Sequence, residues 1–268
     1  MDGLTDAQWA QYEAEGYLVL GKLLDDVALK SLQNRIDEIM LGKSQVGYDR
    51  ISMQLDSDTG RYEDIGKQAQ GLRIATLNYR KIQGLEFDPL FLEYMQLPIF
   101  RDVCARIYGA EIRIASFRAM FMNKPANKGT ILPWHQDRWN KLDRDPLLTV
   151  YTALDPATPD NGCVQIIPRS HHVGLINPDH PSGFLTPEQA EVHCKPEDVL
   201  HLGLEAGEVA LLHNWVLHSS DVNRSEQSRR AFSVCCMDAD TVNTRKNELA
   251  SSSVIFGDGA LTLEIAVA

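Results

Sequence analysis

The apolar positions in the first 110 residues recur mainly with the spacing of helices. Thr5 and Gln8 have the spacing of a capping box, so we expect a helix that begins there and ends at Gly16. A short buried strand, 17–20, should follow it. A second helix is predicted from Asp25 or Asp26 to about residue 40. Its apolar face is formed by Leu29, Leu32, Ile36 and Ile39.

Proline and glycine divide the rest of this region. The segment 42–71 is polar and rich in Asp, Gly and Ser, which favours a lid or binding loop, with disorder as the alternative. A strand is predicted within 74–83. Asp88-Pro89 indicates the start of a third helix, and Pro98 separates it from further helical residues up to about Tyr108. We interpret these helices as a layer packed on a sheet.

From Glu111 onward the pattern changes to that of strands. Asn161-Gly162 has the composition of a hairpin turn between two of them. Many strands after a helical start favour an antiparallel sandwich or barrel of the jelly-roll type. The insertion between Arg169 and Leu204 is expected to fold over the barrel mouth. The predicted strands are Ile112–Met122, Leu147–Leu154, Cys163–Pro168, Glu208–Asn214 and Arg229–Met237.

Neither an internal repeat nor a linker divides the 268 residues, so we predict a single domain over 1–268. A helical layer should occupy about 1–110 and a mainly β core about 111–238. The remaining residues, 239–268, form a tail to which the sequence assigns no role. The fold class is therefore α+β with a mainly β core.

Composition and charge limit the function classes. The net charge of −11 argues against nucleic acid or an anionic membrane as the main partner. The five cysteines contain no CxxC pair, which favours buried thiols in a reducing compartment. No apolar run approaches 18 residues and no signal peptide is evident, so we expect a cytoplasmic protein without a transmembrane helix.

His135 and Asp137 are the central candidates for chemistry. In an extended segment, residues two apart point to the same face, so both side chains can serve one site. His218 follows an apolar run and could complete a 2-His-1-carboxylate site, the open arrangement of non-haem Fe(II) oxygenases. The alternatives are a loop His–Asp pair and a strand histidine that only forms hydrogen bonds.

Arg229 begins another strand-like run eleven residues after His218, where its planar guanidinium could hold a carboxylate through two bonds. Basic residues are also frequent around His135. Either they form a solvated rim, or they attract an anionic co-substrate or substrate. These residues are Arg113, Arg118, Lys124, Lys128, Arg138, Lys141 and Arg144.

Several short motifs, in this order and spacing, resemble the phytanoyl-CoA dioxygenase family of Fe(II)/2-oxoglutarate-dependent oxygenases. The resemblance covers about 79–237 and implies a double-stranded β-helix, a cupin-like jelly roll with N-terminal helices on its major sheet. The motifs are Lys81-Ile82-Gln83, Asn123-Lys124-Pro125, Trp134-His135-Gln136-Asp137, Asp160-Asn161-Gly162-Cys163, Ile167-Pro168-Arg169-Ser170-His171, His218-Ser219-Ser220 and Arg229.

The resemblance also implies roles for single residues. The iron ligands would be His135, Asp137 and His218. Arg229 would bind the distal carboxylate of 2-oxoglutarate, with Ser220 as a hydroxyl donor to the same group.

Four further residues match family positions near the co-substrate. Lys81, Met120 and Gln136 are three of them. Each also has an ordinary explanation, as a solvated lysine, core filler or backbone partner. Tyr151 stands where members can carry tryptophan. Arg169 replaces a glycine usual in the family motif, which indicates either a substrate contact or a different turn.

We therefore expect a hydroxylase that uses Fe(II), 2-oxoglutarate and O2 and releases succinate and CO2. The prime substrate is expected to be a small organic metabolite, with a weak preference for a polar or anionic one. Two alternatives are a cupin-like metal isomerase or dioxygenase that does not use 2-oxoglutarate, and a non-catalytic binding protein on the same fold. The sequence leaves open the oligomeric state.

Overall fold

The computed structural model describes residues 3–251 and 253–262. Its α-helices begin where capping residues predict. The side chains of Thr5, Asp25, Asp88 and Thr186 accept hydrogen bonds from the first turns of α1, α2, α3 and α5, respectively. The α-helices are α1 Asp6–Glu15, α2 Asp26–Met40, α3 Pro89–Met95, α4 Pro98–Tyr108 and α5 Pro187–His193. Single 3₁₀ turns are η1 Tyr62–Asp64, η2 Leu85–Phe87, η3 Ser170–Val173 and η4 Pro196–Asp198.

Two antiparallel sheets form the body of the protein. The larger sheet has the order β1-β10-β7-β12-β5-β4-β2-β3, with β15 paired to β5. Its strands are β1 Tyr17–Lys22, β2 Ser52–Leu55, β3 Ala69–Gln70, β4 Tyr79–Gln83, β5 Ile114–Lys124, β7 Leu148–Ala153, β10 Glu208–His213, β12 Arg229–Asp238 and β15 Val254–Phe256. The smaller sheet has the order β6-β11-β8-β9, with β6 Leu132–His135, β8 Val164–Ile167, β9 Leu200–Leu202 and β11 Leu217–Ser220. A separate hairpin pairs β13 Val242–Asn243 with β14 Glu248–Leu249.

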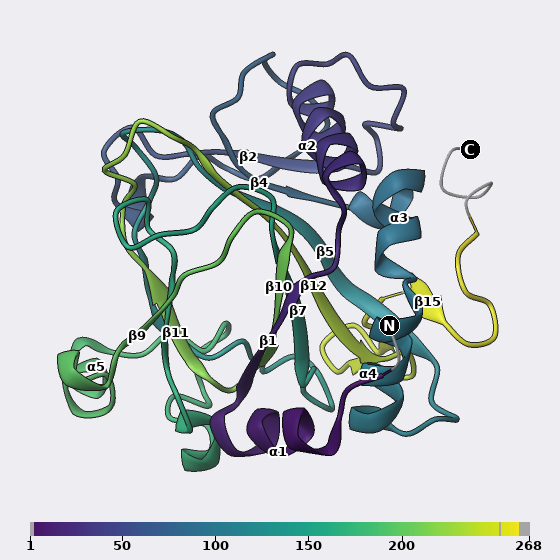
Figure 1. Cartoon of the computed structure of the whole chain (residues 1–268), viewed down its shortest axis with the longest axis vertical. Coiled ribbons are helices and arrows are strands. Elements are labelled where there is room, and N and C mark those ends of the chain that lie inside the picture. Colours follow the sequence, from purple (N-terminus) through teal and green to yellow (C-terminus); the bar gives the residue numbers. More distant parts are fainter. Residues whose placement is uncertain (1–2, 252, 263–268) are drawn as a thin grey trace.

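The chain crosses between the two sheets at every step from β5 to β12 except the one from β8 to β9. This alternation confirms the predicted jelly-roll core. In Figure 1, α2, α3 and α4 lie on one side of the larger sheet, and the smaller sheet lies on the other.

The main hydrophobic core lies between these helices and the larger sheet. Phe232 on β12 packs against Phe91 of α3 with ring centroids 4.8 Å apart, and Tyr94 donates to or accepts from Thr152 of β7 at 2.6 Å. Since alternate strand residues face opposite ways, Arg229, Ala231 and Ser233 of β12 face the space between the sheets. Apart from Arg230, which pairs with Asp37 and Asp155, the outer face of β12 is apolar, and its inner face is partly polar.

Some predictions about elements were wrong. The segment 42–71 is not only a loop, because β2 and β3 extend the larger sheet beyond β4 and Met53 is buried. Asn161-Gly162 does not form a hairpin: it joins β7 of the larger sheet to β8 of the smaller one. The strand predicted at 17–20 is present as β1, which pairs with β10, but only Leu18 of it is buried.

The C-terminal segment 239–268 contributes β15 to the larger sheet, so its described part is more than a tail; residues 252 and 263–268 lie outside the described residues. The insertion 169–204 contains α5 and also β9, a strand of the smaller sheet that the sequence did not predict. All five cysteines are free, and four of them are buried. No helix in the described ranges has the length and apolar character needed to cross a membrane.

Candidate metal centre and pocket

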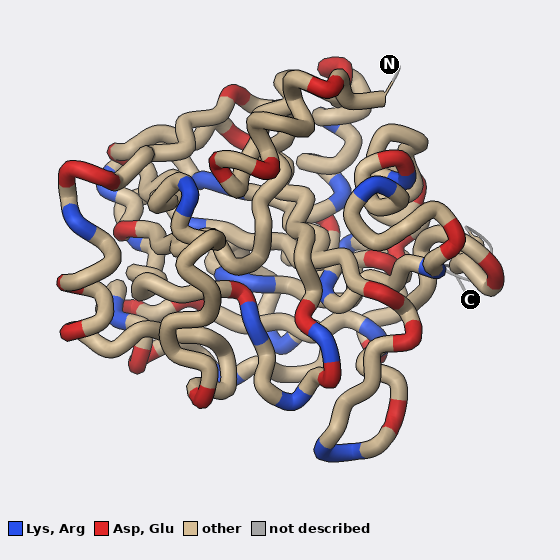
Figure 2. Tube along the Cα trace, turned by 90° about the horizontal axis from the view of Figure 1, so that it is seen from below, with Lys and Arg blue, Asp and Glu red and all other residues tan. Residues whose placement is uncertain are grey.

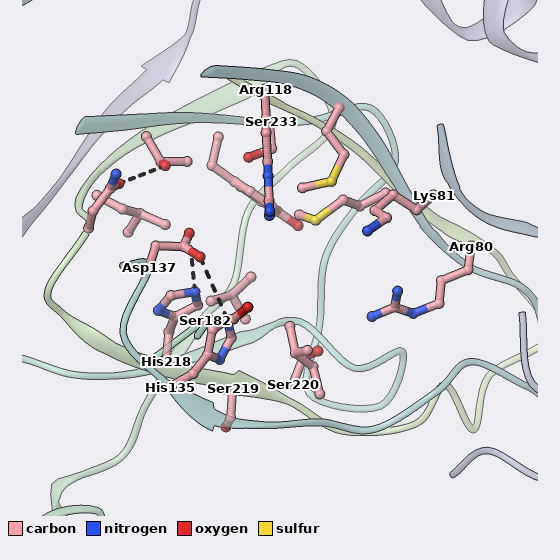
Figure 3. A pocket seen from close by; sticks show the side chains of 18 of the residues that line it. Arg80, Lys81, Arg118, His135, Asp137, Ser182, His218, Ser219, Ser220 and Ser233 are labelled. Atoms are coloured by element: carbon pink, nitrogen blue, oxygen red, sulfur yellow. Dashed lines mark hydrogen bonds and ion pairs between the residues drawn. The ribbon is translucent and has the colours of Figure 1, made fainter. Parts of the chain in front are cut away.

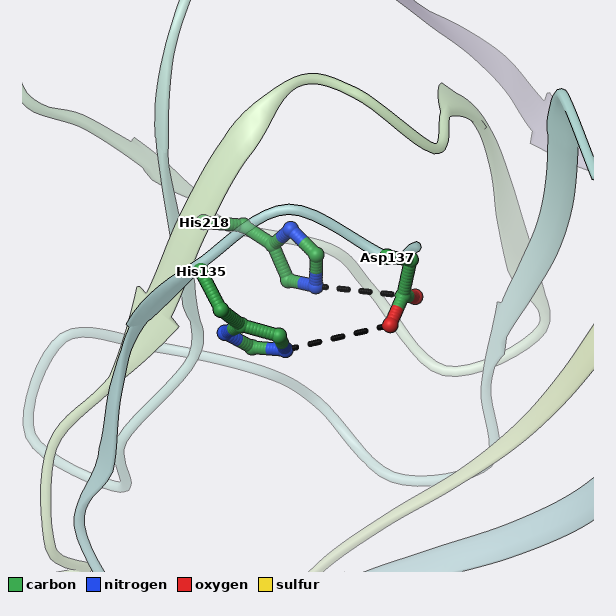
Figure 4. A group of neighbouring side chains, drawn as sticks. All are labelled: His135, Asp137 and His218. Atoms are coloured by element: carbon green, nitrogen blue, oxygen red, sulfur yellow. Dashed lines mark ion pairs between the residues drawn. The ribbon is translucent and has the colours of Figure 1, made fainter. Parts of the chain in front are cut away.

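The pairing of two short strands brings His135 and His218 together. β6 ends at His135, β11 contains His218, and the two residues are direct partners in the antiparallel register. Asp137 follows the end of β6, where its backbone N–H donates to the carbonyl of Asn214 at 2.7 Å. The three side chains offer ligand atoms that all lie within 4.8 Å of one another. Figure 4 shows both imidazole rings directed toward the carboxylate.

Hydrogen bonds set which ring nitrogens are free. Nδ1 of His135 lies 2.9 Å from the carbonyl oxygen of Pro133, and Nδ1 of His218 lies 2.9 Å from that of Val216. Carbonyl oxygens only accept, so Nδ1–H donates and each Nε2 keeps its lone pair. The Nε2 atoms lie 3.9 and 3.7 Å from the oxygens of Asp137. Two imidazole nitrogens and one carboxylate fit a divalent iron ion with open positions.

Burial keeps His135 in the form that binds metals. The residue is 6% exposed, and burial, followed by the nearby His218, lowers its pKa to about 3. At neutral pH the imidazole is therefore uncharged. Phe184 from the insertion stacks on its ring with centroids 4.8 Å apart and planes 17° apart, which closes one side of the centre.

The insertion is held against the metal strand by backbone bonds. Gln136 N–H donates to the carbonyl of Gly183 at 3.1 Å, and Leu185 N–H donates to that of Trp134 at 3.1 Å. Gly183 has a φ of +69°, and a Cβ there would lie 2.0 Å from the Gln136 oxygen. This close approach allows only glycine.

Replacing Gly183 with alanine is expected to push the insertion away from His135 and to lower turnover at least about tenfold, because strain of roughly 1–3 kcal/mol would be relieved by displacement of Phe184. The matched control is Gly174→Ala, a neighbouring glycine with a φ of +82° where an added Cβ would meet no atom within 4 Å. Equal turnover in the two variants, measured as succinate release, would contradict the proposed steric role.

A cavity of about 270 Å³ opens beside the triad, between the two sheets. Figure 3 shows Arg118 entering it from the top and Lys81 and Arg80 from the right, with the triad at the left and Ser220 below. Of the residues predicted near a co-substrate, five line the cavity: Arg229, Ser220, Lys81, Met120 and Tyr151.

Gln136 does not line this cavity. Its side-chain amide donates to the carbonyls of Gly174 and Trp215 at 2.8 and 2.9 Å, and its oxygen accepts from Ile176 N–H at 2.9 Å. With these bonds, the residue ties the insertion to the turn before β11. Its role at the co-substrate stays a prediction from the family pattern.

Arg229 is only 3% exposed and lies at one end of the cavity. Its guanidinium donates to the hydroxyl of Tyr151 at 2.7 Å and to the carbonyl of Gly162 at 2.9 Å, while its buried Nε has no partner among the described residues. Burial raises the pKa of Tyr151. Tyr151 therefore supplies a polar contact as well as an aromatic wall, and the guanidinium is held in place by neutral oxygens.

Lys124 is a cavity residue that the sequence placed in a family motif and among the basic residues of the rim, without a role at the co-substrate. It is the direct cross-strand partner of Arg229, it is 5% exposed, and its ammonium donates to the carbonyl of Thr130. Burial and the positive charges of Arg229 and Arg80 lower its pKa to about 6. Like charges directly opposite on neighbouring strands destabilise a sheet, so this end of the cavity favours an anion.

The predicted basic rim is mostly neutralised by acids. Salt bridges join Arg113 to Asp240, Lys128 to Asp58, Arg138 to Asp145 and Arg144 to Asp238. Figure 2 shows acidic and basic positions interspersed along the outer loops. The positive field of the pocket therefore comes from Arg118, Lys124 and Arg229, together with Arg80 and Lys81 of β4.

Arg169, which replaces the glycine usual in the family motif, adopts the left-handed backbone conformation of a turn. Its φ of +67° is in the left-handed region, which explains why glycine suits the position. The side chain points to solvent, 3.8 Å from Glu15, and does not line the cavity.

A jelly roll whose inner face carries a histidine–carboxylate–histidine group is the architecture of non-haem iron oxygenases. The family model described as phytanoyl-CoA dioxygenase matches residues 12–231. The chain belongs to this family, and so it is an Fe(II)- and 2-oxoglutarate-dependent oxygenase with O2 as its co-substrate.

Individual relatives cover most of the chain. It is 25% identical to a probable phytanoyl-CoA dioxygenase of Caenorhabditis elegans, over 86% of this chain and 74% of the relative. It is 23% identical to an L-proline trans-4-hydroxylase of Streptomyces griseoviridis, over 84% and 83% of the two chains. Among solved structures, the epimerase SnoN, crystallised with Fe3+, alpha ketoglutarate and nogalamycin RO, superposes with a TM-score of 0.66 at 16% identity, over 96% and 95% of the two chains. This last likeness shows the fold alone.

Proposed function

We propose that residues 1–268 form a single oxygenase domain that hydroxylates a small polar or anionic metabolite, converting 2-oxoglutarate to succinate and CO2. In this proposal His135, Asp137 and His218 hold the iron. The supporting observation is that the free Nε2 atoms of both histidines and the carboxylate of Asp137 face one point at the cavity wall. Iron bound there supplies the activation of O2 that the reaction requires.

The other residues of the cavity would bind and orient 2-oxoglutarate. Arg229, fixed by Tyr151 and Gly162, offers its guanidinium to the distal carboxylate, and Ser220 offers a hydroxyl two residues beyond His218 on β11. Lys124 is a second basic group beside Arg229, and a bound carboxylate would favour its charged form. Met120 and Lys81 also line the cavity. Met120 accepts a weak hydrogen bond from Gln83 at 3.6 Å, which fixes its thioether.

The alternatives find less support. A metal enzyme that does not use 2-oxoglutarate would not require two buried basic residues at the end of its cavity. A binding protein without catalytic activity would not require a complete set of iron ligands. The relative whose name is L-proline trans-4-hydroxylase supports hydroxylation of a small molecule. A cytoplasmic location stays a prediction.

The product is expected to gain one oxygen atom and no chlorine. Iron halogenases of this type replace the carboxylate ligand with a small residue, which opens a position for chloride, whereas Asp137 fills that position here. Desaturation, epoxidation or ring closure depend on how the substrate is held. Mass spectrometry of the product formed in chloride buffer measures the outcome: a mass increase of one oxygen agrees with the proposal, and incorporation of chlorine contradicts it.

A screen of small metabolites for substrate-stimulated succinate release tests the proposed function as a whole. The release must require Fe(II), O2 and 2-oxoglutarate together, and it must be accompanied by an oxidised product. Product formation without 2-oxoglutarate would favour the cupin-like alternative.

A further inference from the structure

The cavity is unusually rich in positive charge. Five cationic side chains line it, and the only carboxylate among its lining residues is that of Asp137; the cations are Arg80, Lys81, Arg118, Lys124 and Arg229. Of the acids outside the lining, Asp221 pairs with Arg224 at 2.7 Å. Asp56 accepts from the Thr130 hydroxyl, and its charge acts on Arg80 and Lys124.

Iron and co-substrate leave part of this charge unbalanced. Fe(II), the two carboxylates of 2-oxoglutarate, Asp137 and Arg229 together have no net charge. Lys124 lies beside Arg229 and can be assigned to the same end. Asp56 can offset the charge of Arg80, so Lys81 and Arg118 remain. Both are partly shielded from solvent. Because taking unpaired charge out of water is costly, these two residues indicate a further anion in the complete complex.

Arg118 is the cavity cation farthest along β5 from the residues assigned to the distal carboxylate of 2-oxoglutarate. It lies six residues before Lys124 on β5, about 20 Å along a strand that rises roughly 3.3 Å per residue. Burial, then the charge of Arg118 and then that of Arg80, lower the pKa of Lys81 to about 7. For Lys124, the charges that lower the pKa are those of Arg229 and Arg80. The cations thus form two groups, with Arg80 near both. Arg229 and its cross-strand partner Lys124 are the cations at the distal end of a dianion held by iron, so binding of this dianion does not require Arg118.

The guanidinium of Arg118 is held in place but has no anionic partner. It lies 4.5 Å from the ring centroid of Trp139 and 5.4 Å from that of Phe117. Among residues 3–251 and 253–262, it makes no hydrogen bond or ion pair. Stacking on an aromatic ring leaves the edge of the guanidinium, with its N–H donors, free to bind an oxyanion. Figure 3 shows this side chain pointing into the cavity.

We propose that Arg118, stacked on Trp139, binds a carboxylate or phosphate group of the prime substrate at the end of the cavity away from Arg229. This inference rests on the proposed function and specifies its substrate class: small organic acids or phosphate esters. The cavity of about 270 Å³ must also hold 2-oxoglutarate, so only a small acid, or the acidic end of a longer one, enters it.

Matched probes separate charge from shape. Each acid is compared with a neutral partner: L-proline with L-prolinamide, benzoate with benzamide, and glycerol 3-phosphate with glycerol. Binding to the enzyme loaded with Fe(II) and 2-oxoglutarate is measured without O2 by calorimetry and by tryptophan fluorescence, because Trp139 should respond to an anion on Arg118. Substrate-stimulated succinate release is then measured with O2.

The variants are Arg118→Gln and the control Arg113→Gln, a change of the same kind just before the start of β5, where the arginine is already paired with Asp240. We expect at least one acid to bind about tenfold or more tightly than its neutral partner, and Arg118→Gln to remove this difference while Arg113→Gln keeps it. The carboxylate and phosphate pairs show which oxyanion is preferred.

The proposal is overturned if neutral partners bind as well as their acids, if no acid or phosphate ester binds, or if the two variants behave alike. Failure of the proposed function gives another result: the wild-type enzyme releases no succinate with any probe, although calorimetry still detects binding of acids at Arg118.

Discussion

Replacing His218 with alanine is expected to abolish both iron binding and turnover. In the proposed site His218 and His135 would contribute the two nitrogen ligands, and the carboxylate of Asp137 alone would not hold the metal in this open arrangement. Loss of a group that only orients a ligand already costs about 10–100-fold in metal affinity, so loss of a ligand should cost more than about 100-fold. Iron content after dialysis and succinate release measure the two effects.

The control for this variant is His201→Ala, since His201 is an exposed histidine on β9 at the edge of the smaller sheet. His135→Ala should behave like His218→Ala, and thermal unfolding should confirm that each variant is folded. Retained turnover in either ligand variant would remove the assignment of the iron site.

The second large effect is expected at Arg229. Replacing it with glutamine should raise the KM for 2-oxoglutarate by about 30-fold or more, because removing one partner of a buried charge pair costs roughly 2–5 kcal/mol. The kcat at saturating 2-oxoglutarate should change less, since the iron ligands are untouched. The KM of Arg229→Lys should lie between those of the wild type and Arg229→Gln, because lysine keeps the charge and loses the planar pair of donors. Initial rates of succinate release over a range of 2-oxoglutarate concentrations measure this.

Arg224→Gln is the matched control, because Arg224 is a nearby exposed arginine already paired with Asp221. Its KM should equal that of the wild type. If Arg229→Gln also leaves the KM unchanged while remaining folded, the anchor lies elsewhere, and a metal enzyme independent of 2-oxoglutarate becomes the better account.

Local sequence signals predicted α1 to α4, but α5 was not predicted although Thr186 and Gln189 form a capping box there. Caps such as Thr5, Asp25 and Asp88 act within one turn, so their meaning does not depend on the rest of the fold. The Asn161-Gly162 signal failed for the opposite reason. A turn composition does not specify whether the next strand pairs with the last or crosses to another sheet, and here it crosses. β9 was missed because it has only three residues, too few to show a period.

The sequence named the triad because its residue types and order are specific, although proximity required the pairing of β6 with β11. The sequence did not show which basic residues face the cavity and which are neutralised by acids. Whether Arg118 faces the cavity depends on strand register, and whether Arg113 or Arg144 is neutralised depends on acids 127 or 94 positions away. The cavity position of Lys124 could have been predicted, because it follows Arg118, Met120 and Met122 at two-residue steps and so lies on the same strand face.

The most direct test of the central claim is the absorbance spectrum of the folded protein on adding Fe(II) and 2-oxoglutarate without O2. If His135, Asp137 and His218 hold iron with open positions, chelation by 2-oxoglutarate should produce a visible absorption band. The band should be present in wild type and absent in His218→Ala. Wild-type protein that is folded and loaded with iron, yet shows no band at saturating 2-oxoglutarate, would contradict the account.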